Sequence, residues 1–290
     1  ITKRLKIGVI GVGHMGQYHV NVINMLPQRF EMLGVYDQNS DTMKEVAKKF
    51  ETNYFDQLED LLQQADAMVI AVPTSLHYDI ALKALHEGVH VLLEKPITET
   101  VAQAEELINL AQQKGLILQV GHVERFNGAV QEVYKIINNP LLIECRRMSP
   151  ASSRITDVGV VLDLMIHDLD IVINLVKSPI LKISAIGNSI FSDQAEDVAH
   201  VHIQFENGTV AHFSASRASQ SKIRTLSISQ EKAYIFLNYA DQDVHIHRQA
   251  ASAYLMTREE IRYSQESFIE QLYVHKDNPL KLEQIHFYEC

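Results

Sequence analysis

The chain has 290 residues, 46% hydrophobic and 21% charged, which is a globular composition long enough for two domains of ordinary size. Its formal net charge of −10 disfavours nucleic-acid and anionic-membrane partners, which attract clustered Lys and Arg, and no apolar run reaches the roughly 18 residues of a membrane span. Cys145 and Cys290 give neither a disulfide framework nor a metal-ligand spacing, so we expect a protein of the reducing cytoplasm.

Apolar runs and helical stretches alternate through the first 121 residues. The runs that we interpret as strands cover residues 6–11, 31–37, 67–73, 90–96 and 116–122. The segments between them carry apolar residues at three- and four-residue spacing, which indicates helices at 16–26, 41–50, 76–88 and 100–115. Apolar strands that alternate with helices predict a parallel sheet covered on both faces. We therefore expect a doubly wound α/β domain over residues 1–121.

A glycine-rich turn follows the first of these strands. Its G-x-G-x-x-G spacing comes from Gly11, Gly13 and Gly16, with His14 and Met15 inside the same loop. The first glycine permits a tight turn, the second lets a pyrophosphate approach the backbone, and the third lets strand and helix pack closely. The pattern predicts a Rossmann dinucleotide-binding loop whose five residues contact the cofactor.

Asp37 ends the second apolar run. A carboxylate at this place would accept hydrogen bonds from the adenosine ribose and repel a 2′-phosphate. The alternative is an aspartate that only caps the next helix. Because strand, glycines, helix, strand and acid follow in the expected order, we predict NAD as the cofactor in preference to NADP.

After residue 121 a few helices are followed by consecutive strands. Helices are expected at 126–139 and near Val158–Val176, with a short strand at 141–148 between them. Further strands are expected at 181–191, 197–205, 209–216, 223–230, 232–239 and 243–249. Asn207-Gly208 predicts a two-residue hairpin turn. Residues 122–290 should therefore form an α+β domain with a mostly antiparallel sheet. The last residues resemble a helix stopped in mid-pattern, so we expect the chain to be incomplete at its C-terminus.

Histidines alternate along the predicted strands 197–205 and 243–249. No Cys or carboxylate accompanies them at ligand spacing, so we interpret them as strand-face residues and predict no metal site.

Polar residues recur along the apolar helix near Val158–Val176. Asp163, His167, Asp170 and Asn174 share one narrow stripe of that helix. The stripe is either an internally satisfied polar seam or part of a catalytic site. An Asp one turn from a His suits catalysis, because the carboxylate can orient the imidazole and stabilise its protonated form.

Glu94, Lys95 and Pro96 end the apolar strand at residues 90–96. Ligands of doubly wound sheets bind outside the carboxyl ends of the strands, which would place Lys95 beside the reactive part of a dinucleotide. A lysine, an aspartate and a histidine there could oxidise a secondary alcohol, since one group accepts the hydroxyl proton and the ammonium stabilises the developing alkoxide. The alternative is a solvated loop lysine.

These motifs together resemble the Gfo/Idh/MocA family, named for glucose-fructose oxidoreductase and inositol dehydrogenase. The resemblance covers essentially the whole chain and rests on the glycine loop, "VPTSLH", "EKP" and the D-x-x-x-H helix. It implies that Lys95, Asp163 and His167 are catalytic. It also implies an oligomer contact through the second domain's sheet, and cofactor-lining roles for Val72, Pro73, Thr74, Leu76, His77, Glu94 and His122.

The chain departs from the family at Met165, which stands where Gly usually separates the Asp and the His. Its bulk is expected to narrow or reshape the sugar pocket. A finer similarity links "GHVERFNGAV" and "ITDVGVVLDLMIHDLDI" to the branch of UDP-N-acetylglucosamine 3-dehydrogenases. This similarity implies substrate contacts from Arg125, Asn127 and Arg154, whereas the alternative for each arginine is an ordinary surface ion pair.

We therefore expect an NAD-dependent oxidoreductase acting on a secondary hydroxyl of a sugar, cyclitol or nucleotide-sugar, assembled as a homodimer or homotetramer. Lys95, Asp163 and His167 are expected to share one site, with His167 as proton acceptor. A regulator that keeps the dinucleotide fold without chemistry is one alternative, but it would not need all three residues. A reductase of a non-sugar double bond is another, but it would not need the Asp–His pair.

Overall fold

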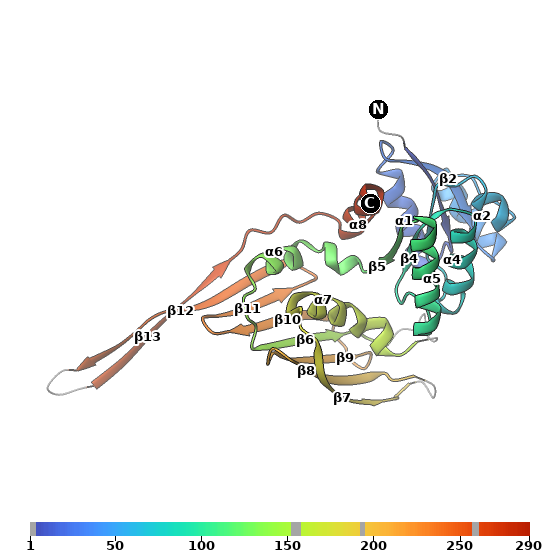
Figure 1. Ribbon diagram of the computed structural model, residues 1–290. Helices are drawn as coiled ribbons and strands as arrows, with labels where there is room; N and C mark the ends of the chain where they lie inside the picture. The colour runs from blue at the N-terminus through green and yellow to red at the C-terminus, as the bar shows by residue number, and fades with distance from the viewer. Residues whose placement is uncertain (1–3, 152–157, 192–194, 257–260) are drawn as a thin grey trace. The chain divides into compact units, whose positions relative to one another are not determined.

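The computed structural model describes residues 4–151, 158–191, 195–256 and 261–290, with side chains outside 249–266. The chain divides into two compact units (Figure 1). Unit 1 contains Ile1–Val123 and Asn278–Cys290, and unit 2 contains Glu124–Asp277. No helix among these described residues has both the length and the apolar character needed to cross a bilayer.

Unit 1 is built on a five-stranded parallel sheet of order β2-β1-β3-β4-β5. Its strands are β1 (Leu5–Ile10), β2 (Phe30–Tyr36), β3 (Ala67–Ile70), β4 (His90–Glu94) and β5 (Leu118–Gly121). Its helices are α1 (His14–Asn24), α2 (Ser40–Lys49), α3 (Leu58–Leu62), α4 (His77–His86), α5 (Val101–Lys114) and α8 (Pro279–Glu289). The doubly wound α/β domain predicted from the sequence is confirmed.

Both faces of this sheet are buried, as the apolar strands predicted. Val69 of β3 packs into the core on one face, whereas Met68 and Ile70 pack into the core on the other. The helices between the strands are set by local signals. For example, Thr100 caps α5 through the Gln103 amide, and reciprocal bonds between the two residues complete a capping box.

The C-terminal helix α8 belongs to unit 1 rather than to the domain in which the sequence placed it. Leu280 and Phe287 of α8 are buried in the same core as residues of α1 and α2. The Gln284 amide nitrogen also lies 2.8 Å from Nδ1 of His19 in α1. Spacing along the chain could not reveal this return, because the amphipathic pattern of a terminal helix does not specify which core it covers.

Unit 2 contains an eight-stranded sheet of order β13-β12-β11-β10-β6-β9-β8-β7. All neighbours are antiparallel except β6 and β9. The strands are β6 (Leu142–Met148), β7 (Ile180–Asn188), β8 (Val198–Phe205), β9 (Val210–Ser216), β10 (Ile223–Gln230), β11 (Ala233–Asn238), β12 (Asp243–Met256) and β13 (Ile261–Gln271). The helices are α6 (Gly128–Ile136), the π-helical turn η3 (Val161–Met165) and α7 (Ile166–Val176).

The predicted α+β class of this half is confirmed, and β8 and β9 form the expected hairpin. Its turn differs from the predicted two-residue turn, because the amide of Gly208 donates to the carbonyl oxygen of Phe205 at 3.0 Å, so Glu206 and Asn207 are the central residues and Gly208 follows them. Gly208 has a φ of +89°, which only glycine adopts without strain. Two features were not expected. β12 extends well beyond residue 249, and β13 follows it, although the letters of β13 show no regular alternation of apolar and polar residues.

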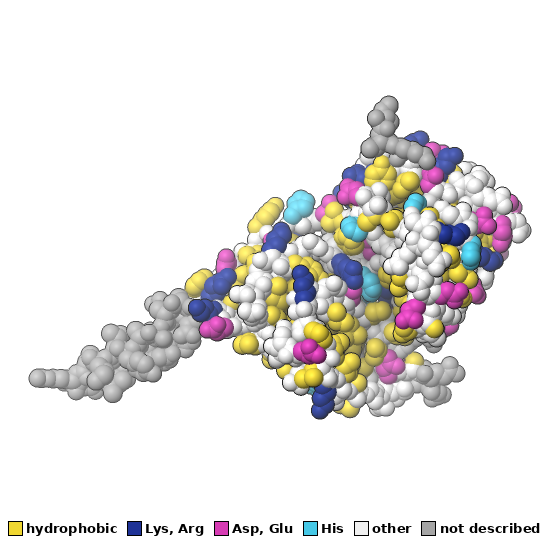
Figure 2. All heavy atoms as spheres, viewed as in Figure 1, with side chains coloured by type: hydrophobic (Ala, Val, Ile, Leu, Met, Phe, Trp, Pro, Cys, Tyr) yellow, Lys and Arg dark blue, Asp and Glu magenta, His cyan; other side chains and the backbone are white. Residues whose placement is uncertain are grey.

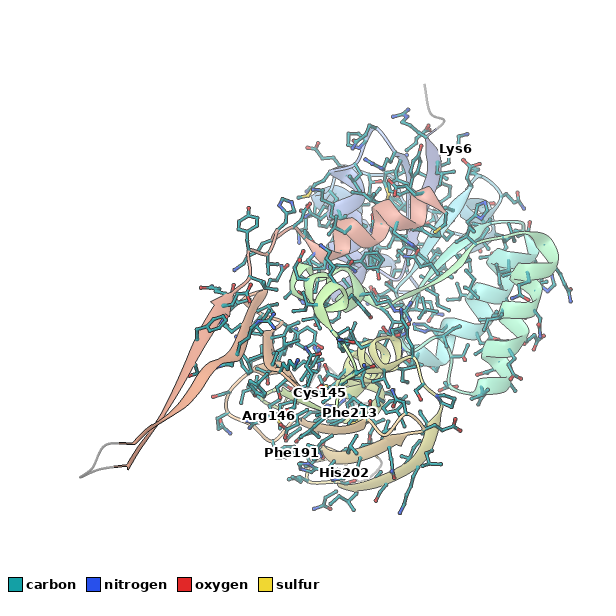
Figure 3. All side chains as sticks on the ribbon, turned by 60° about the vertical axis from the view of Figure 1, so that its left-hand side comes forward. Lys6, Cys145, Arg146, Phe191, His202 and Phe213 are labelled. Atoms are coloured by element: carbon teal, nitrogen blue, oxygen red, sulfur yellow. The ribbon has the colours of Figure 1, made fainter. Side chains whose placement is uncertain are left out.

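The two faces of the unit 2 sheet differ in character. On β6, Cys145 is buried in the core beneath the helices, whereas Arg146 is exposed on the opposite, open face (Figure 3). His202 of β8, one of the predicted strand-face histidines, lies on that open face, where its Nδ1 is 3.2 Å from Nδ1 of His212 in β9. Burial and the neighbouring His202 and His200 lower the pKa of His212, which favours its neutral form.

A buried ion-pair network joins this sheet to its helices. Arg147 of β6 is 2% exposed and donates to both carboxylate oxygens of Asp168 in α7, at 3.0 and 2.8 Å. Its remaining terminal nitrogen donates to Glu124 at 3.0 Å, and its Cζ lies 4.9 Å from the ring centre of Tyr239. Burial acts to lower the pKa of Arg147, but the carboxylates outweigh it and raise that pKa. Loss of one partner from such a network typically costs about 3–5 kcal/mol, so it fixes α7 against the sheet.

Candidate active site

The glycine loop of unit 1 is shaped by three different steric requirements. Gly11 has a φ of +83°, and a Cβ there would meet the backbone of Ala71. A Cβ on Gly16 would overlap the carbonyl oxygen of Gly11, so α1 can approach β1 this closely only without a side chain. Gly13 has a φ of −64° and a ψ of −158°, an extended conformation with negative φ, and a Cβ on it would meet no atom within 4 Å. The fold therefore does not require glycine at position 13, and the open space there is suited to a ligand.

The helix that follows this loop presents free donors to that space. Gly13 is the N-cap of α1, and the first turn of α1 carries neither a capping side-chain hydrogen bond nor an acidic residue. The first amides of a helix lack intrahelical partners, and the helix dipole favours an anion at this end. The arrangement fits a dinucleotide pyrophosphate, as the sequence predicted. His14 and Met15, also predicted to contact the cofactor, form the exposed start of this helix.

Asp37 follows the end of β2 and is held in place by the backbone. Its Oδ2 accepts from the amide of Val12 at 2.8 Å, and its Oδ1 accepts from the amide of Asn39 at 2.8 Å. The capping alternative considered from the sequence is not what the structure shows, since the N-cap of α2 is Asn39. The carboxylate is therefore fixed beside the glycine loop, where an adenosine ribose would lie.

One cleft of about 440 Å³ contains six of the predicted cofactor-lining residues. The six are Gly11, Gly13, Asp37, Val72, Pro73 and Leu76, and the same cleft is lined by Ile10, Tyr36, Gln38, Asn39, Thr42, Ala71 and Ile80. Its walls come from the segments that follow β1, β2 and β3, because parallel strands bring their carboxyl ends to one edge of the sheet.

Thr74 and His77 lie close to the cleft lining in sequence but play different parts. Thr74 begins the short 3₁₀ turn η1 (Thr74–Leu76). His77 is 1% exposed, and its Nδ1 and Nε2 lie 2.7 and 3.0 Å from the carbonyl oxygens of Pro96 and Val72. Carbonyl oxygens only accept, so a ring nitrogen that carries hydrogen donates to the carbonyl oxygen it faces. His77 thus ties the segment after β3 to the segment after β4.

Glu94 and Lys95 stand at the end of β4, as predicted. Glu94 is 9% exposed and accepts a hydrogen bond from Nε2 of His19 at 2.8 Å. Burial acts to raise the pKa of Glu94, but the hydrogen bond and charge of His19, together with Lys95, outweigh it and lower that pKa. The amide of Lys95 also donates to the Glu94 carboxylate at 3.3 Å. Glu94 is therefore an ionised group that fixes the turn carrying the half-buried Lys95.

His122 follows the end of β5, the strand next to β4. Glu94 pairs with Gly121 in the sheet register, so Lys95 and His122 are the next residues on adjacent strands. A Cβ on Gly121 would lie 3.2 Å from the Glu94 carboxylate, which explains the small residue before His122. The structure therefore brings Glu94, Lys95 and His122 together at one sheet edge.

The Asp–His pair of unit 2 lies where the π-helical turn passes into α7. Asp163 is in η3, and His167 is the second residue of α7. Asp163 accepts from Nη2 of Arg217 at 3.3 Å, and the same nitrogen donates to the carbonyl oxygen of Val158 at 2.7 Å. Turns of π-helix are rare and are frequent at functional sites. Met165 between the pair is fully buried in the unit 2 core, so its side chain serves packing there.

The other members of the polar stripe are engaged with protein groups. The carboxylate of Asp170 accepts hydrogen bonds from both Nε and Nη2 of Arg125. The side-chain amide of Asn174 donates to the backbone carbonyl oxygen of Asp170 at 2.8 Å. Burial and the Asp170 carboxylate raise the pKa of Tyr134 to about 12. Arg125 thus forms the ion pair considered as its alternative, and its contact with substrate stays a prediction.

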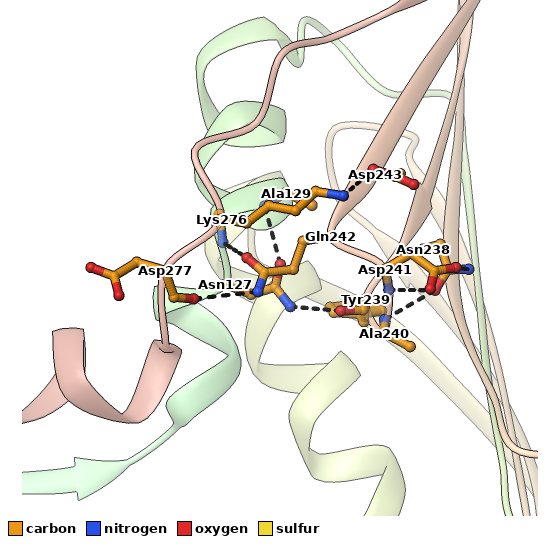
Figure 4. Close-up of polar contacts among 11 residues, drawn as sticks. Asn127, Ala129, Asn238, Tyr239, Ala240, Asp241, Gln242, Asp243, Lys276 and Asp277 are labelled. Atoms are coloured by element: carbon orange, nitrogen blue, oxygen red, sulfur yellow. Dashed lines mark hydrogen bonds and ion pairs between the residues drawn. The ribbon is translucent and has the colours of Figure 1, made fainter. Parts of the chain in front are cut away.

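Asn127 acts within unit 2 as a helix cap and a tether (Figure 4). Its Oδ1 accepts from the amide of Ala129, and its Nδ2 donates to the carbonyl oxygen of Tyr239 at 3.0 Å. Asn127 is 3% exposed, so little of its side chain is accessible to a substrate. Arg154, the third predicted substrate contact, lies outside the described residues.

Sequence reasoning missed the groups that hold these residues in place. His19, Gln284, Asp168, Arg147 and Arg217 are all buried. Among the described residues, one set of three potential metal ligands comes together, His19, Glu94 and Glu283. Hydrogen bonds to Glu94 and Gln284 already use both ring nitrogens of His19. The only sign of these groups in the sequence was the presence of polar residues within apolar helices and strands. That pattern does not show which residues they bind in the fold.

The fold and strand-end residues of unit 1 define a dinucleotide-binding oxidoreductase of the α/β class. Residues 5–122 match the family model described as "Oxidoreductase family, NAD-binding Rossmann fold", and residues 128–236 match the GFO/IDH/MocA C-terminal domain. The chain belongs to the GFO/IDH/MocA family and is an NAD-dependent oxidoreductase.

Similar proteins include several dehydrogenases. UDP-N-acetylglucosamine 3-dehydrogenase of Acidithiobacillus ferrooxidans is 34% identical over 85% of this chain and 78% of its own length. A solved structure of that enzyme, GnnA, has a TM-score of 0.88 and 30% identity, covering 99% of this chain and 89% of its own. The scyllo-inositol 2-dehydrogenase (NAD(+)) of Bacillus subtilis is 28% identical over 74% of this chain and 68% of its own length.

The glycine loop yields a matched pair of variants. Gly13→Ala should fold with unchanged thermal stability, because its Cβ enters open space, but should bind NADH at least about tenfold more weakly, because that space receives the pyrophosphate. Gly16→Ala should lower the free energy of unfolding by about 1–3 kcal/mol, because its Cβ overlaps the Gly11 carbonyl. Thermal unfolding and fluorescence titration with NADH measure both effects. Wild-type NADH affinity in Gly13→Ala would contradict the assigned pyrophosphate position.

Proposed function

We propose that the protein oxidises a secondary hydroxyl group of a nucleotide-sugar, with the C3 hydroxyl of UDP-N-acetylglucosamine as the substrate group. The observation that carries this proposal is the 34% identity to a UDP-N-acetylglucosamine 3-dehydrogenase over 85% of the chain. The similarity to GnnA over 99% of the chain supports it. In the oxidation, the carbon-bound hydrogen leaves as hydride and the hydroxyl hydrogen leaves as a proton, so a ketone remains. NAD supplies the hydride acceptor.

The catalytic roles follow from the chemistry of three residues. Lys95 donates a hydrogen bond to the reacting oxygen and stabilises the developing negative charge. His167 accepts the hydroxyl proton, and Asp163 orients the imidazole and stabilises its protonated form. The position of Lys95 after β4, beside the ionised Glu94, supports its part in this proposal. The cofactor-lining residues are those at the strand ends of unit 1, and Arg154 is kept as a further candidate for substrate binding.

A direct assay tests the reaction. Wild-type protein mixed with NAD and UDP-N-acetylglucosamine should form NADH, and the sugar product should be two mass units lighter than the substrate because it has lost a hydride and a proton. Turnover of inositol or free N-acetylglucosamine without turnover of the nucleotide-sugar would contradict the proposal.

Lys95→Met should reduce turnover by about a hundredfold or more, because it keeps the length of the side chain and removes the charge that stabilises the alkoxide. NADH affinity should stay within a few-fold of the wild type. Lys83→Met is a matched control, because Lys83 is an exposed lysine on α4 of the same unit. Initial rates and NADH titration measure both variants. If Lys95→Met turned over at the wild-type rate, Lys95 would be only a solvated loop residue and not a catalytic one.

NAD should bind more tightly than NADP, because the fixed carboxylate of Asp37 repels a 2′-phosphate. Asp37→Asn should narrow the difference, since it removes the charge and keeps an oxygen that can accept from the Val12 amide. Fluorescence titration of both variants with NADH and NADPH measures this preference. Equal binding of the two cofactors by the wild type would show that Asp37 does not select between them.

We also propose a cytoplasmic homodimer or homotetramer. Cys145 and Cys290 are free, which suits a reducing compartment. All nine residues of β7, an edge strand of unit 2, are exposed, and four of them carry large apolar side chains, Ile180, Leu181, Ile183 and Ile186. An exposed apolar edge of this kind is usually covered in the native assembly. Figure 2 shows that, in contrast, charged and hydrophobic side chains are interspersed over the viewed face of unit 1.

Light scattering should therefore give a mass of two or four chains at micromolar concentration. Ile183→Lys should shift the protein toward the monomer, because it places a charge in the proposed contact. Ile108→Lys, an equivalent change at an exposed residue of α5, should not do so. A monomeric wild-type protein would contradict the proposed assembly.

A further inference from the structure

Arg224 of β10 lies directly opposite Arg147 of β6 in the unit 2 sheet. Both side chains are on the face that the helices cover, because Leu226 and Ile228, which alternate with outward-facing residues on the same strand, are buried in that core. Like charges placed opposite one another on adjacent strands repel each other. Such a pair needs a compensating anion for each guanidinium.

Arg147 has its compensating anions within the protein. Three of its nitrogens donate to the carboxylates of Asp168 and Glu124. Arg224 differs, because its guanidinium makes no hydrogen bond or ion pair with any residue that the structure describes, although it is more than half buried. Burial and the adjacent charge of Arg147 lower the pKa of Arg224. Arg224 therefore carries a partly desolvated charge for which the described part of the chain provides no directly bonded anion.

The surroundings of Arg224 connect it to the predicted Asp–His pair. The carboxylates of Glu124, Asp168 and Asp163 stabilise the charge of Arg224 electrostatically without bonding to it. Their hydrogen bonds go instead to Arg147 and Arg217. Asp163 accepts a hydrogen bond from Arg217, the residue after β9. Ala215 of β9 pairs with Arg147 in the sheet register, and Arg217, two residues further on, is therefore on the same face of the sheet as Arg147. Arg217 is 6% exposed, and its Nε is a buried donor without a hydrogen-bond partner among the described residues. Two arginines with unused donors, Arg217 and Arg224, thus lie on the helix-covered face of the sheet, and the first of them is bonded to Asp163.

We propose that Arg224 binds the diphosphate of the nucleotide-sugar substrate, an inference that rests on the proposed function. The planar guanidinium presents paired N–H donors that match two phosphate oxygens, and it is less strongly hydrated than a lysine ammonium. A diphosphate supplies the anionic partner that Arg224 does not have among the described residues. The diphosphate is attached at C1 of the sugar, two ring positions from C3, so a substrate that is oxidised at C3 needs an anion site near the catalytic residues but distinct from them, and Arg224 is close enough to Asp163 for the two charges to interact.

This role predicts discrimination between substrates rather than an effect on the chemical step. Arg224→Gln should raise the KM for UDP-N-acetylglucosamine at least about tenfold, since a charge-assisted contact to phosphate is lost, and should leave kcat within a few-fold. It should also weaken UDP binding at least about tenfold. Arg224→Lys should retain part of the UDP affinity, because it keeps the charge and loses the paired donors.

The decisive measurement is calorimetric titration with UDP in the presence of saturating NAD, so that UDP does not occupy the NAD site. Lys232→Gln is the control, because Lys232 is an exposed residue of the β10–β11 turn and the variant makes the same change in charge. It should bind UDP like the wild type. NADH affinity and circular dichroism of Arg224→Gln should match the wild type, since the NAD-lining residues identified above all belong to unit 1.

The outcomes separate this inference from the proposed function. If the wild type oxidises UDP-N-acetylglucosamine and Arg224→Gln has the same KM and UDP affinity, the inference is wrong and the proposed reaction stands. If UDP binding depends on Arg224 but no nucleotide-sugar is turned over, the anion site stands and the reaction is wrong. Absence of UDP binding by the wild type would overturn the inference. A folded Arg224→Met variant should behave like Arg224→Gln, so misfolding of one variant leaves the question decidable.

Discussion

The candidate cofactor site depends on the parallel direction of the five strands in unit 1. Because all five carboxyl ends meet at one edge, the glycine loop, Asp37, Val72, Lys95 and His122 reach the same region from segments far apart in the sequence. His77 and Glu94 then fix the loops that these ends carry, the first through two carbonyl oxygens and the second through the amide of Lys95. The geometry of the edge is therefore set by buried polar groups beneath it.

In unit 2 the main physical constraint is the burial of charged side chains between the sheet and its helices. Arg147 is stabilised there because Asp168 and Glu124 satisfy its donors, at the cost of removing all three groups from water. Arg217 and Asp163 repeat the arrangement one strand away. Arg224 lies opposite Arg147 in the sheet and forms no ion pair with any carboxylate of the described residues. The contrast between compensated and uncompensated arginines is what makes this end of the sheet suited to an anionic ligand.

Much of this organisation could be predicted from the sequence. Apolar runs and helical spacing identified the parallel domain, and Asn207-Gly208 identified a hairpin, because these signals are local. The partners of buried charges could not be predicted, since Arg147 and Asp168 meet only through the tertiary fold. The π-helical turn at Asp163 could not be predicted from the sequence either. Nor could the burial of the Met165 side chain in the core of unit 2. The strand β13 lacked the alternation on which a strand prediction depends.

The return of α8 to unit 1 has a consequence for how the protein is made. A ribosome releases the chain from its N-terminus, so β1 to β5 emerge long before the helix whose Leu280 and Phe287 complete their core and whose Gln284 contacts His19. Until then, apolar surface of α1 and the buried imidazole beside Glu94 lack their cover. The apolar surface that α8 covers therefore stays accessible to solvent and chaperones until all of unit 2 has been synthesised.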